Sequence, residues 1–224
     1  KIKLPVMVIM DGFNVSHSVE NLDILGDNEV RKFLGEYGPE NSLLDVKHPM
    51  TFGPLALQNS YFEFKIDQSE AMQKVFLEMP RICEEFRKLS GRKYGFFEKY
   101  GIKDAEEVLV MMGSATGTAK DAVDGMEKKV GIVKLTLFRP FPHKEILETL
   151  KEKERVAVFD RAMSPGTKPP LYSEILSSLF ESGMVHDVRS YVYGLGGRDI
   201  FKKDFEKVIK DLDKKGNGRI NYIQ

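Results

Sequence analysis

The sequence of 224 residues contains a single cysteine, Cys83. A disulfide within the chain needs two thiols and an iron–sulfur cluster needs several, so this chain alone can build neither. A lone cysteine fits a reducing cytosol, and we expect a cytoplasmic protein. Because Cys83 lies on the apolar stripe of an expected helix, we interpret it as a small core residue and not as a nucleophile.

An excess of charge of one sign is also missing, since 34 basic residues balance 34 acidic ones. The two signs are interspersed, so we expect no nucleic-acid partner and no anionic membrane surface as a partner. No apolar run approaches the roughly 20 residues that a membrane-spanning helix needs, and the N-terminus lacks the pattern of a signal peptide. A composition that is 42% hydrophobic and 30% charged is typical of one large or two small globular domains.

The sequence does contain a strand–turn–helix unit at residues 108–124. The apolar residues 108–112 predict a buried strand. They end at the small polar turn 113–118, where glycine permits a sharp bend and a hydroxyl could cap the helix that follows. We expect this unit to open an α/β domain.

Strands and helices alternate after this unit. The expected strands are residues 131–138, 155–159 and 188–193, and the expected helices are residues 144–150, 171–180 and 205–212. This alternation predicts parallel pairing with right-handed crossovers, and hence a small three-layer α/β domain.

Charged residues follow the expected strand ends and should gather at one edge of the sheet. They are Arg139, Asp160, Arg161, Arg198 and Asp199. The three arginines could clamp a carboxylate or a phosphate. Arginines beside aspartates also tie loops together or pair across subunits, and we favour the subunit interface.

Residues 4–10 form a continuous apolar run, which predicts a strand buried on both faces of a parallel sheet. One strand cannot supply its own sheet, so we expect its neighbours upstream or in another chain, and this chain to be the C-terminal part of something longer. The run ends at Asp11, which is a candidate interface or ligand-facing residue, and His17 follows in a polar loop where α/β proteins place ligands. His17 could face a substrate; we favour a loop histidine that bonds to backbone or to a neighbouring subunit.

The segment between these regions has the features of a connection. Glycine and proline signals at residues 22–54 leave room for one short helix at 29–34. Apolar residues at helical spacing predict an amphipathic helix at 66–89. Pro80 inside it predicts a kink, or a second helix that begins there.

Two local patterns have ligand-binding alternatives. The turn 113–118 could cradle a phosphate, but the dinucleotide spacing of glycines is absent, and Pro140 and Pro142 make a rigid corner beside Arg139 more plausible than a 2′-phosphate site. The end of the chain resembles a calcium loop, but Lys215 and Gln224 stand where oxygen ligands are required. We therefore expect a solvated tail there.

Several motifs occur together in a fixed order: PVMVIMDGFNVSHSVE, HPMTFG followed by Tyr61, Glu63 and Gln68, GSATGTAKDAVD, FRPFP, VAVFDRA and YVYGLGGRD. In this order and spacing they resemble the alpha subunit of the 2-oxoacid:ferredoxin oxidoreductases, and most of all the pyruvate enzymes. The loop at residues 164–170 is stiffer than the family pattern, and Phe201 stands where the family often has a threonine.

The resemblance implies a domain order. Residues 1–21 would be the tail of a thiamine-pyrimidine-binding domain, residues 22–101 an interdomain connection with an amphipathic helix, and residues 102–224 a transketolase C-terminal-like domain with a mainly parallel sheet.

The resemblance also implies an activity. Family members carry out coenzyme A-dependent oxidative decarboxylation of a 2-oxoacid such as pyruvate on thiamine diphosphate and magnesium, and pass electrons through iron–sulfur clusters to ferredoxin. The beta, gamma and delta subunits, or fused equivalents, complete the enzyme. The family's cofactor-binding positions match no residue here, so we expect no cofactor bound by this chain alone and a mainly structural role in assembly. The alternatives are a non-catalytic interaction module and, less favoured, a nucleotide-binding domain.

Overall fold

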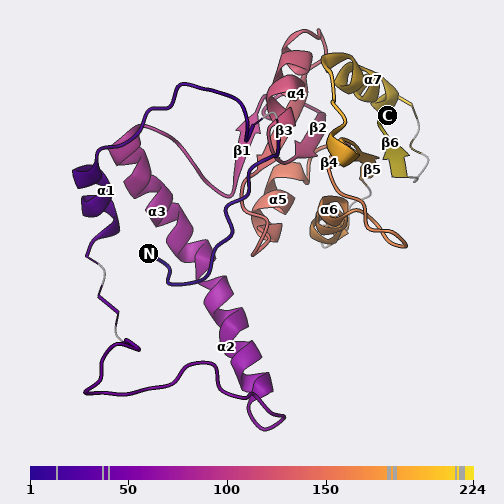
Figure 1. Ribbon diagram of the computed structural model, residues 1–224. Helices are drawn as coiled ribbons and strands as arrows, with labels where there is room; N and C mark the ends of the chain where they lie inside the picture. The colour runs from indigo at the N-terminus through magenta and orange to yellow at the C-terminus, as the bar shows by residue number, and fades with distance from the viewer. Residues whose placement is uncertain are drawn as a thin grey trace. The chain divides into compact units, whose positions relative to one another are not determined.

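The computed structural model describes residues 1–13, 15–36, 38–39, 41–180, 183, 186–214, 216 and 220–224. Two positions used in the sequence analysis lie outside these residues. One is Lys215, in the stretch that resembles a calcium loop, and the other is residue 14, the first of the loop that contains His17. The chain divides into two compact units. One comprises residues 1–6 and 21–94, and the other residues 7–20 and 95–224 (Figure 1).

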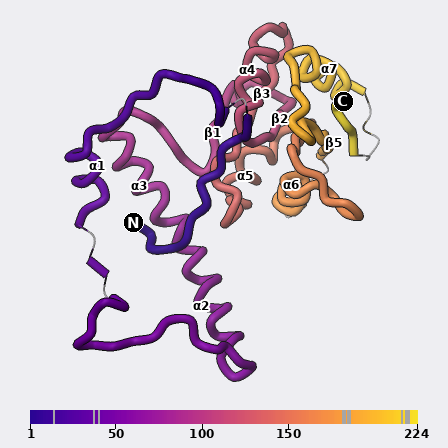
Figure 2. Tube along the Cα trace, viewed as in Figure 1, coloured from indigo at the N-terminus to yellow at the C-terminus, as the bar shows by residue number. Residues whose placement is uncertain are grey.

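The first unit contains helices α1 (Asp27–Leu34), α2 (Tyr61–Gln73) and α3 (Val75–Ser90). The expected short helix is confirmed as α1. A helix beginning at Pro80 is wrong, because α3 begins at Val75 and includes Pro80. Only Lys74 separates α2 from α3 (Figure 2), and its backbone keeps helical angles, with φ −62° and ψ −21°.

Aromatic side chains hold α1 against α3. The rings of Phe33 and Phe86 meet edge to face with centroids 5.5 Å apart, and Lys1 Nζ lies 4.6 Å from the centroid of Phe33. Cys83 is only half-buried, and burial raises the pKa of its thiol, so it is not an activated nucleophile. By contrast α2 has no buried residue, and Phe62 at its start is 70% exposed.

The apolar run at residues 4–10 is not the buried strand that its composition predicts. It has no strand assignment, and its side chains are open, with Val8 92% and Ile9 86% exposed. The physical reason is that an isolated strand has no partner for its backbone N–H and C=O groups and no surface to cover its side chains. The expectation that a sheet from elsewhere accepts this run stays a prediction.

The second unit is built on a six-stranded sheet in the order β1-β3-β2-β4-β5-β6. Its strands are β1 (Phe97–Tyr100), β2 (Glu107–Met111), β3 (Val130–Leu135), β4 (Arg155–Asp160), β5 (Asp187–Val192) and β6 (Ile220–Tyr222). The four predicted strands are confirmed, and they pair in parallel.

The two outer strands were not predicted. β1 pairs antiparallel with β3. β6 pairs in parallel with β5, so the expectation of a solvated tail is wrong for Ile220–Tyr222. Both are edge strands with short or alternating sequences, and the neighbour that they pair with decides their conformation.

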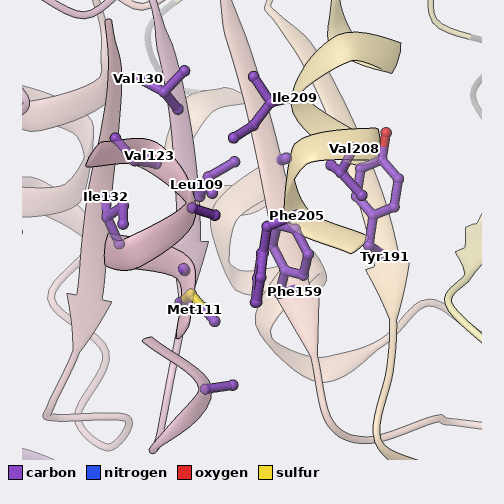
Figure 3. Packing of buried hydrophobic residues seen from close by; sticks show 14 of the residues in the cluster. Leu109, Met111, Val123, Val130, Ile132, Phe159, Tyr191, Phe205, Val208 and Ile209 are labelled. Atoms are coloured by element: carbon purple, nitrogen blue, oxygen red, sulfur yellow. The ribbon is translucent and has the colours of Figure 1, made fainter. Parts of the chain in front are cut away.

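Helices cover both faces of this sheet, which confirms the expected three-layer α/β fold (Figure 1). α4 (Ala115–Asp124) and α7 (Lys202–Leu212) pack on one face, while α5 (His143–Leu150) and α6 (Pro170–Phe180) pack on the other. On the α7 side the ring of Phe159 lies between Tyr191 and Phe205, with centroids 5.4 and 5.2 Å away (Figure 3). No helix within the described ranges is long and apolar enough to cross a bilayer.

Candidate functional site

The segment Met7–Glu20 contacts the carboxyl edge of the sheet through Asp11. The amide of Ser114, directly before α4, donates to Asp11 Oδ2 at 2.6 Å, and the Ser114 hydroxyl donates to the same oxygen at 2.5 Å. Arg161, directly after β4, places Nη1 3.5 Å from Asp11 Oδ1. Asp11 and Arg161, two of the predicted site residues, therefore lie together.

Two glycines make room for this contact. At Gly113 φ is +80°, and a Cβ atom would lie 2.7 Å from Asp11 Oδ2. At Gly194 φ is +66°, and a Cβ atom would lie 2.8 Å from Nε of Arg161. Any other residue at these positions would be strained and would collide with one of the two charged groups.

The start of α4 differs from the expectation of a hydroxyl cap. The sequence predicted that a hydroxyl of the turn 113–118 caps this helix, but Ser114, the residue before α4, makes no side-chain cap hydrogen bond. The hydroxyl of Thr116 donates back to the carbonyl of Gly113 instead. The carboxylate of Asp11 accepts the amide of Ser114, which directly precedes α4, at the helix end that favours negative charge.

The surroundings of Asp11 favour its charged form. Partial burial raises the pKa of Asp11, but the hydrogen bonds from Ser114 and the charge of Arg161 together outweigh burial, so the pKa is lowered. The Asp11 side chain is 23% exposed and that of Arg161 36%, so solvent weakens the pair but does not separate it.

Asp160, another predicted site residue, faces inward. It is 1% exposed, and its two carboxylate oxygens accept the amides of Leu171 and Tyr172 at 2.8 and 3.0 Å, in the first turn of α6. Burial raises the pKa of Asp160 despite these two hydrogen bonds. Asp160 thus caps a helix inside the domain, and its carboxylate does not face a partner.

Tyr193, whose ring is buried beside these groups, was not among the predicted site residues. Burial raises the pKa of Tyr193 to about 12, with Arg161 opposing the shift and Asp11 and Asp160 adding to it. Its position directly after β5 and before Gly194 is the signal that could have identified it. The phenol stays protonated at neutral pH and is no general base.

Arg139 lies at the same edge but belongs to a separate contact. Its Nη2 is 2.6 Å from Oε1 of Glu174 on α6, and Nε2 of His143 is 3.5 Å from the other Glu174 oxygen. The predicted corner is present, with a cis peptide bond between Arg139 and Pro140. Arg139 thus joins this corner to α6, whereas Arg161 joins the loop after β4 to Asp11.

The remaining predicted residues do not join these contacts. His17 is exposed; its ring stacks on Phe13 with centroids 5.6 Å apart, and its Nδ1 lies 2.7 Å from the Ser16 hydroxyl. Arg198 and Asp199 are exposed on the loop between β5 and α7. Within the part of the chain that the structure describes, neither of these two side chains has an ion pair.

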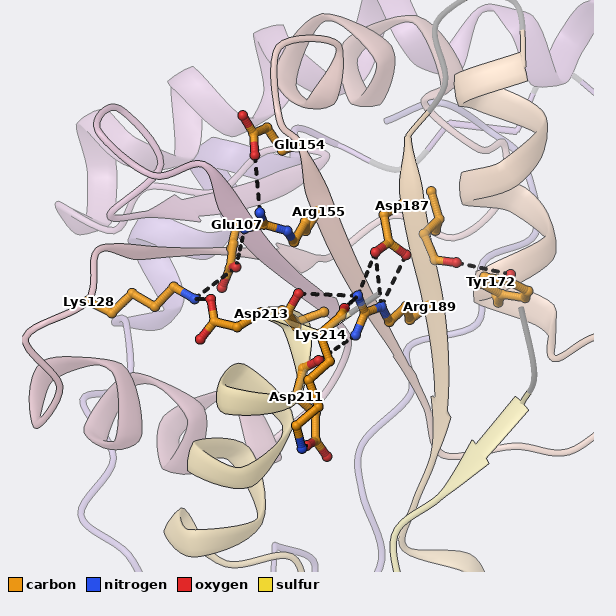
Figure 4. Close-up of polar contacts among 12 residues, drawn as sticks. Glu107, Lys128, Glu154, Arg155, Tyr172, Asp187, Arg189, Asp211, Asp213 and Lys214 are labelled. Atoms are coloured by element: carbon orange, nitrogen blue, oxygen red, sulfur yellow. Dashed lines mark hydrogen bonds and ion pairs between the residues drawn. The ribbon is translucent and has the colours of Figure 1, made fainter. Parts of the chain in front are cut away.

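A second charged cluster, at the amino edge of the sheet, was also missed (Figure 4). Glu107 begins β2 and is 1% exposed; its Oε1 accepts from Arg155 Nη1 at 2.8 Å and from Lys128 Nζ at 2.9 Å. Arg155 begins β4 and stands directly opposite Glu107 in the strand register. The signal in the sequence was a charged residue at the first position of an apolar strand.

Arg189 continues this cluster to the end of α7. Its guanidinium donates to the carbonyls of Asp211 at 2.6 Å, Leu212 at 3.2 Å and Lys214, and it pairs with Asp187 (Figure 4). A cation that binds the last carbonyls of a helix satisfies its open acceptors and complements its dipole. The charged residues at the amino edge therefore stabilise the fold.

The described residues do not fit a metal centre. No group of three or more histidine, cysteine, aspartate or glutamate side chains lies close enough in the described ranges to hold a metal ion. The single cysteine cannot by itself supply the several thiolates that an iron–sulfur cluster needs.

Comparison with known families agrees with this architecture. Residues 105–205, which span the sheet unit from before β2 into α7, match the family "Pyruvate:ferredoxin oxidoreductase core domain II". Residues 1–81 match "Pyruvate flavodoxin/ferredoxin oxidoreductase, thiamine diP-bdg". The chain belongs to the pyruvate:ferredoxin oxidoreductase family. Its core-domain-II region is the three-layer unit, whose fold is compatible with that of transketolase C-terminal-like domains.

Curated members of this family are similar over almost the whole chain. Pyruvate synthase subunit PorA of Thermotoga maritima is 46% identical over 94% of the chain, which covers 54% of that protein. The same subunit of Methanocaldococcus jannaschii is 37% identical over 94% of the chain and 55% of the relative. Ketoisovalerate oxidoreductase subunit VorA of Pyrococcus horikoshii is 34% identical over 95% of the chain and 55% of the relative. The chain thus spans about half the length of these relatives.

Proposed function

We propose that this chain is part of the alpha subunit of a thiamine diphosphate-dependent pyruvate:ferredoxin oxidoreductase. In the complete assembly the reaction is the coenzyme A-dependent oxidative decarboxylation of pyruvate to acetyl-CoA. The observation that carries the proposal is the presence of two regions of this family, in order, on one chain. The relatives named pyruvate synthase subunit PorA support pyruvate as the substrate.

Within that assembly we propose a structural role for the chain. Four of the predicted site residues support it, because their charged groups are used inside the chain: Arg161 pairs with Asp11, Arg139 pairs with Glu174, and Asp160 accepts the amides of α6. Two exposed residues at the same edge, Arg198 and Asp199, remain available for contacts with another subunit.

We propose a division of labour along the sequence. Residues 1–21 would complete a thiamine-pyrimidine-binding domain. Residues 22–101 would connect the domains and end with β1 at the edge of the sheet, and residues 102–224 would supply the rest of the transketolase C-terminal-like domain. The exposed run at residues 4–10 supports the first assignment, since it is strand-like in composition and open to a sheet from elsewhere.

Cofactors and partners follow from the same proposal. Thiamine diphosphate, magnesium and iron–sulfur clusters would be bound by other parts of the assembly, which we expect to include beta, gamma and delta subunits or fused equivalents. Ferredoxin would accept the electrons. We expect the assembly in the cytoplasm, because the lone cysteine suits a reducing compartment.

Reconstitution tests this proposal. The chain is combined with the remainder of the alpha subunit and the partner subunits, and ferredoxin reduction is measured with pyruvate, thiamine diphosphate and coenzyme A. We expect turnover by the assembly and none by the 224-residue chain alone. Turnover by the isolated chain, or an assembly equally active without it, would contradict the proposal.

The substrate has one specific competitor. The relative named ketoisovalerate oxidoreductase subunit VorA is 34% identical, against 37–46% for the two named pyruvate synthase subunits. Comparing kcat/KM for pyruvate and 2-ketoisovalerate in the reconstituted assembly decides between them.

Nucleotide binding is disfavoured, because the turn before α4 already holds the carboxylate of Asp11. Titration of the chain with NADP tests this, and we expect no binding.

A further inference from the structure

The turn before α4 has the construction of an anion site. A buried strand ends in a glycine with φ +80°, the amide and hydroxyl of Ser114 point the same way, and Arg161 adds a positive charge. Helix N-termini with free amides bind phosphates and carboxylates in this manner. Here the anion is present in the structure, and it is the chain's own carboxylate, Asp11, 103 residues away in sequence.

We propose that Asp11 is the internal ligand of this site and acts as a latch that holds the segment Met7–Glu20 on the carboxyl edge of the sheet. The Asp11 latch comprises Asp11, Ser114 and Arg161. The proposal does not depend on the enzymatic activity, since it concerns which group fills the turn and what that contact fixes.

Little else in the structure fixes this segment. Its apolar residues Met7 to Met10 are 63–92% exposed, and Phe13 is 79% exposed, so burial contributes little to its position. Its one described backbone–backbone hydrogen bond, from the His17 amide to the Phe13 carbonyl, lies within the segment itself, as does the bond from the Ser18 hydroxyl to the Val15 carbonyl. The contacts of Asp11 therefore supply most of the attachment.

The site is also shaped for its charged groups on both sides. A side chain at Gly113 would displace the carboxylate, and one at Gly194 would displace the guanidinium, which also donates to the Gly194 carbonyl at 3.4 Å. Two glycines with positive φ, on loops after different strands, thus leave room for the two halves of one ion pair. This arrangement is more specific than a helix end that happens to meet a carboxylate.

Hydrogen exchange of the Ser114 amide in the 224-residue chain tests the latch. In Asp11→Ala the amide loses its acceptor, and its exchange rate should rise on the order of tenfold or more, as the loss of a charge-assisted hydrogen bond implies. Asp11→Asn keeps one acceptor oxygen but no charge, so its rate should fall between Asp11→Ala and wild type. Glu20→Gln removes a carboxylate from the same segment and should leave the rate unchanged.

A second readout follows the segment itself. Chymotrypsin cleavage after Phe13, measured relative to cleavage after Phe52 in the other unit, should accelerate in Asp11→Ala and remain at the wild-type ratio in Glu20→Gln. Wild-type rates at both Ser114 and Phe13 in Asp11→Ala would overturn the proposal. So would an equal acceleration at the buried amide of Leu109 in both Asp11 variants, because the effect would then be global unfolding.

Discussion

The two edges of the sheet both carry charged side chains, but the charges serve different purposes. At the amino edge Glu107 and Arg189 are 1% and 7% exposed, and they join strand starts to one another and to the end of α7. At the carboxyl edge Asp11 and Arg161 are partly exposed and join a distant segment to a glycine turn. A charge that is fully buried must be paired or the fold fails, whereas a partly exposed pair can open without unfolding the domain.

The loop motifs and the stabilising ion pairs thus lie at opposite ends of the same strands. In parallel sheets the carboxyl ends carry the loops that meet ligands or partners. The amino ends can then be closed by ion pairs, as the direct pairing of Glu107 with Arg155 across β2 and β4 illustrates.

The largest effect is expected for Glu107→Gln. The change removes the negative charge between Lys128 and Arg155 and leaves a polar group that is 1% exposed with poorer partners. The free energy of unfolding should fall by about 3 kcal/mol, near the low end for breaking a buried pair, because both cations can still reach water. Urea unfolding followed by circular dichroism measures it.

The control is Glu154→Gln, whose side chain is 61% exposed and lies 3.4 Å from Arg155. A surface pair of this kind should change stability by less than about 0.5 kcal/mol. Equal effects of the two substitutions would mean that the amino-edge cluster does not act as a buried network.

A smaller effect is expected for Arg189→Met. The variant keeps an apolar stem but removes the donors to the carbonyls of Asp211, Leu212 and Lys214 at the end of α7. We expect a loss of about 2 kcal/mol, since buried acceptors lose their partners and Asp187 loses its cation. Thermal unfolding of this variant is compared with that of Lys210→Met, which removes an exposed cation from the last turn of α7. If both variants lose the same stability, the hydrogen bonds from Arg189 do not stabilise the end of this helix.

At the carboxyl edge, Gly113→Ala should cost about 1–2 kcal/mol. An alanine would be strained at φ +80°, and its Cβ atom would meet the Asp11 carboxylate. Gly117→Ala is the matched control: it lies inside α4 with no atom near its Cβ position, so it should raise stability by up to about 1 kcal/mol. Chemical unfolding gives the change in the free energy of unfolding for each variant. If Gly113→Ala is as stable as the wild type, the turn does not need glycine to accommodate Asp11.

The sequence predicted the central strands because buried parallel strands are continuous apolar runs, as in β2 and β4. The same prediction failed for residues 4–10, because an apolar run forms a strand only beside another strand and this run has none to pair with among the described residues. The sequence also missed β1 and β6, whose conformation depends on the strand beside them. The local hydrophobic pattern thus predicts the type of element, but a strand forms only where a neighbouring strand can pair with it.

The candidate site divides in the same way. Placing Arg139, Asp160 and Arg161 at one edge followed from parallel strands that end together, and the structure has them there. Their partners were not predictable, because the reach of a side chain to Glu174, to the amides of α6 or to Asp11 depends on loop geometry. The turn 113–118 was expected to supply a local hydroxyl cap, whereas the hydroxyl and amide of Ser114 bond to Asp11, 103 residues away in sequence.

The smallest effect concerns acid titration of two carboxyls at the carboxyl edge. Partial burial raises the pKa of Asp11, but the hydrogen bonds from Ser114 and the charge of Arg161 outweigh it, so this pKa is lower than usual for an aspartate. Burial raises the pKa of Asp160 above the usual value. Asp11 therefore contributes stability that is present above the unfolded-state pKa and is lost as pH falls from about that value through its folded pKa. Asp160 has the opposite sign, since its folded form holds a proton more tightly and loses stability as pH rises through its folded pKa. Carbon-13 shifts of the two carboxyls, followed from pH 6 downward, should show Asp160 protonating first. If Asp11 protonates first, the contrast between a solvent-facing latch and an inward helix cap is wrong.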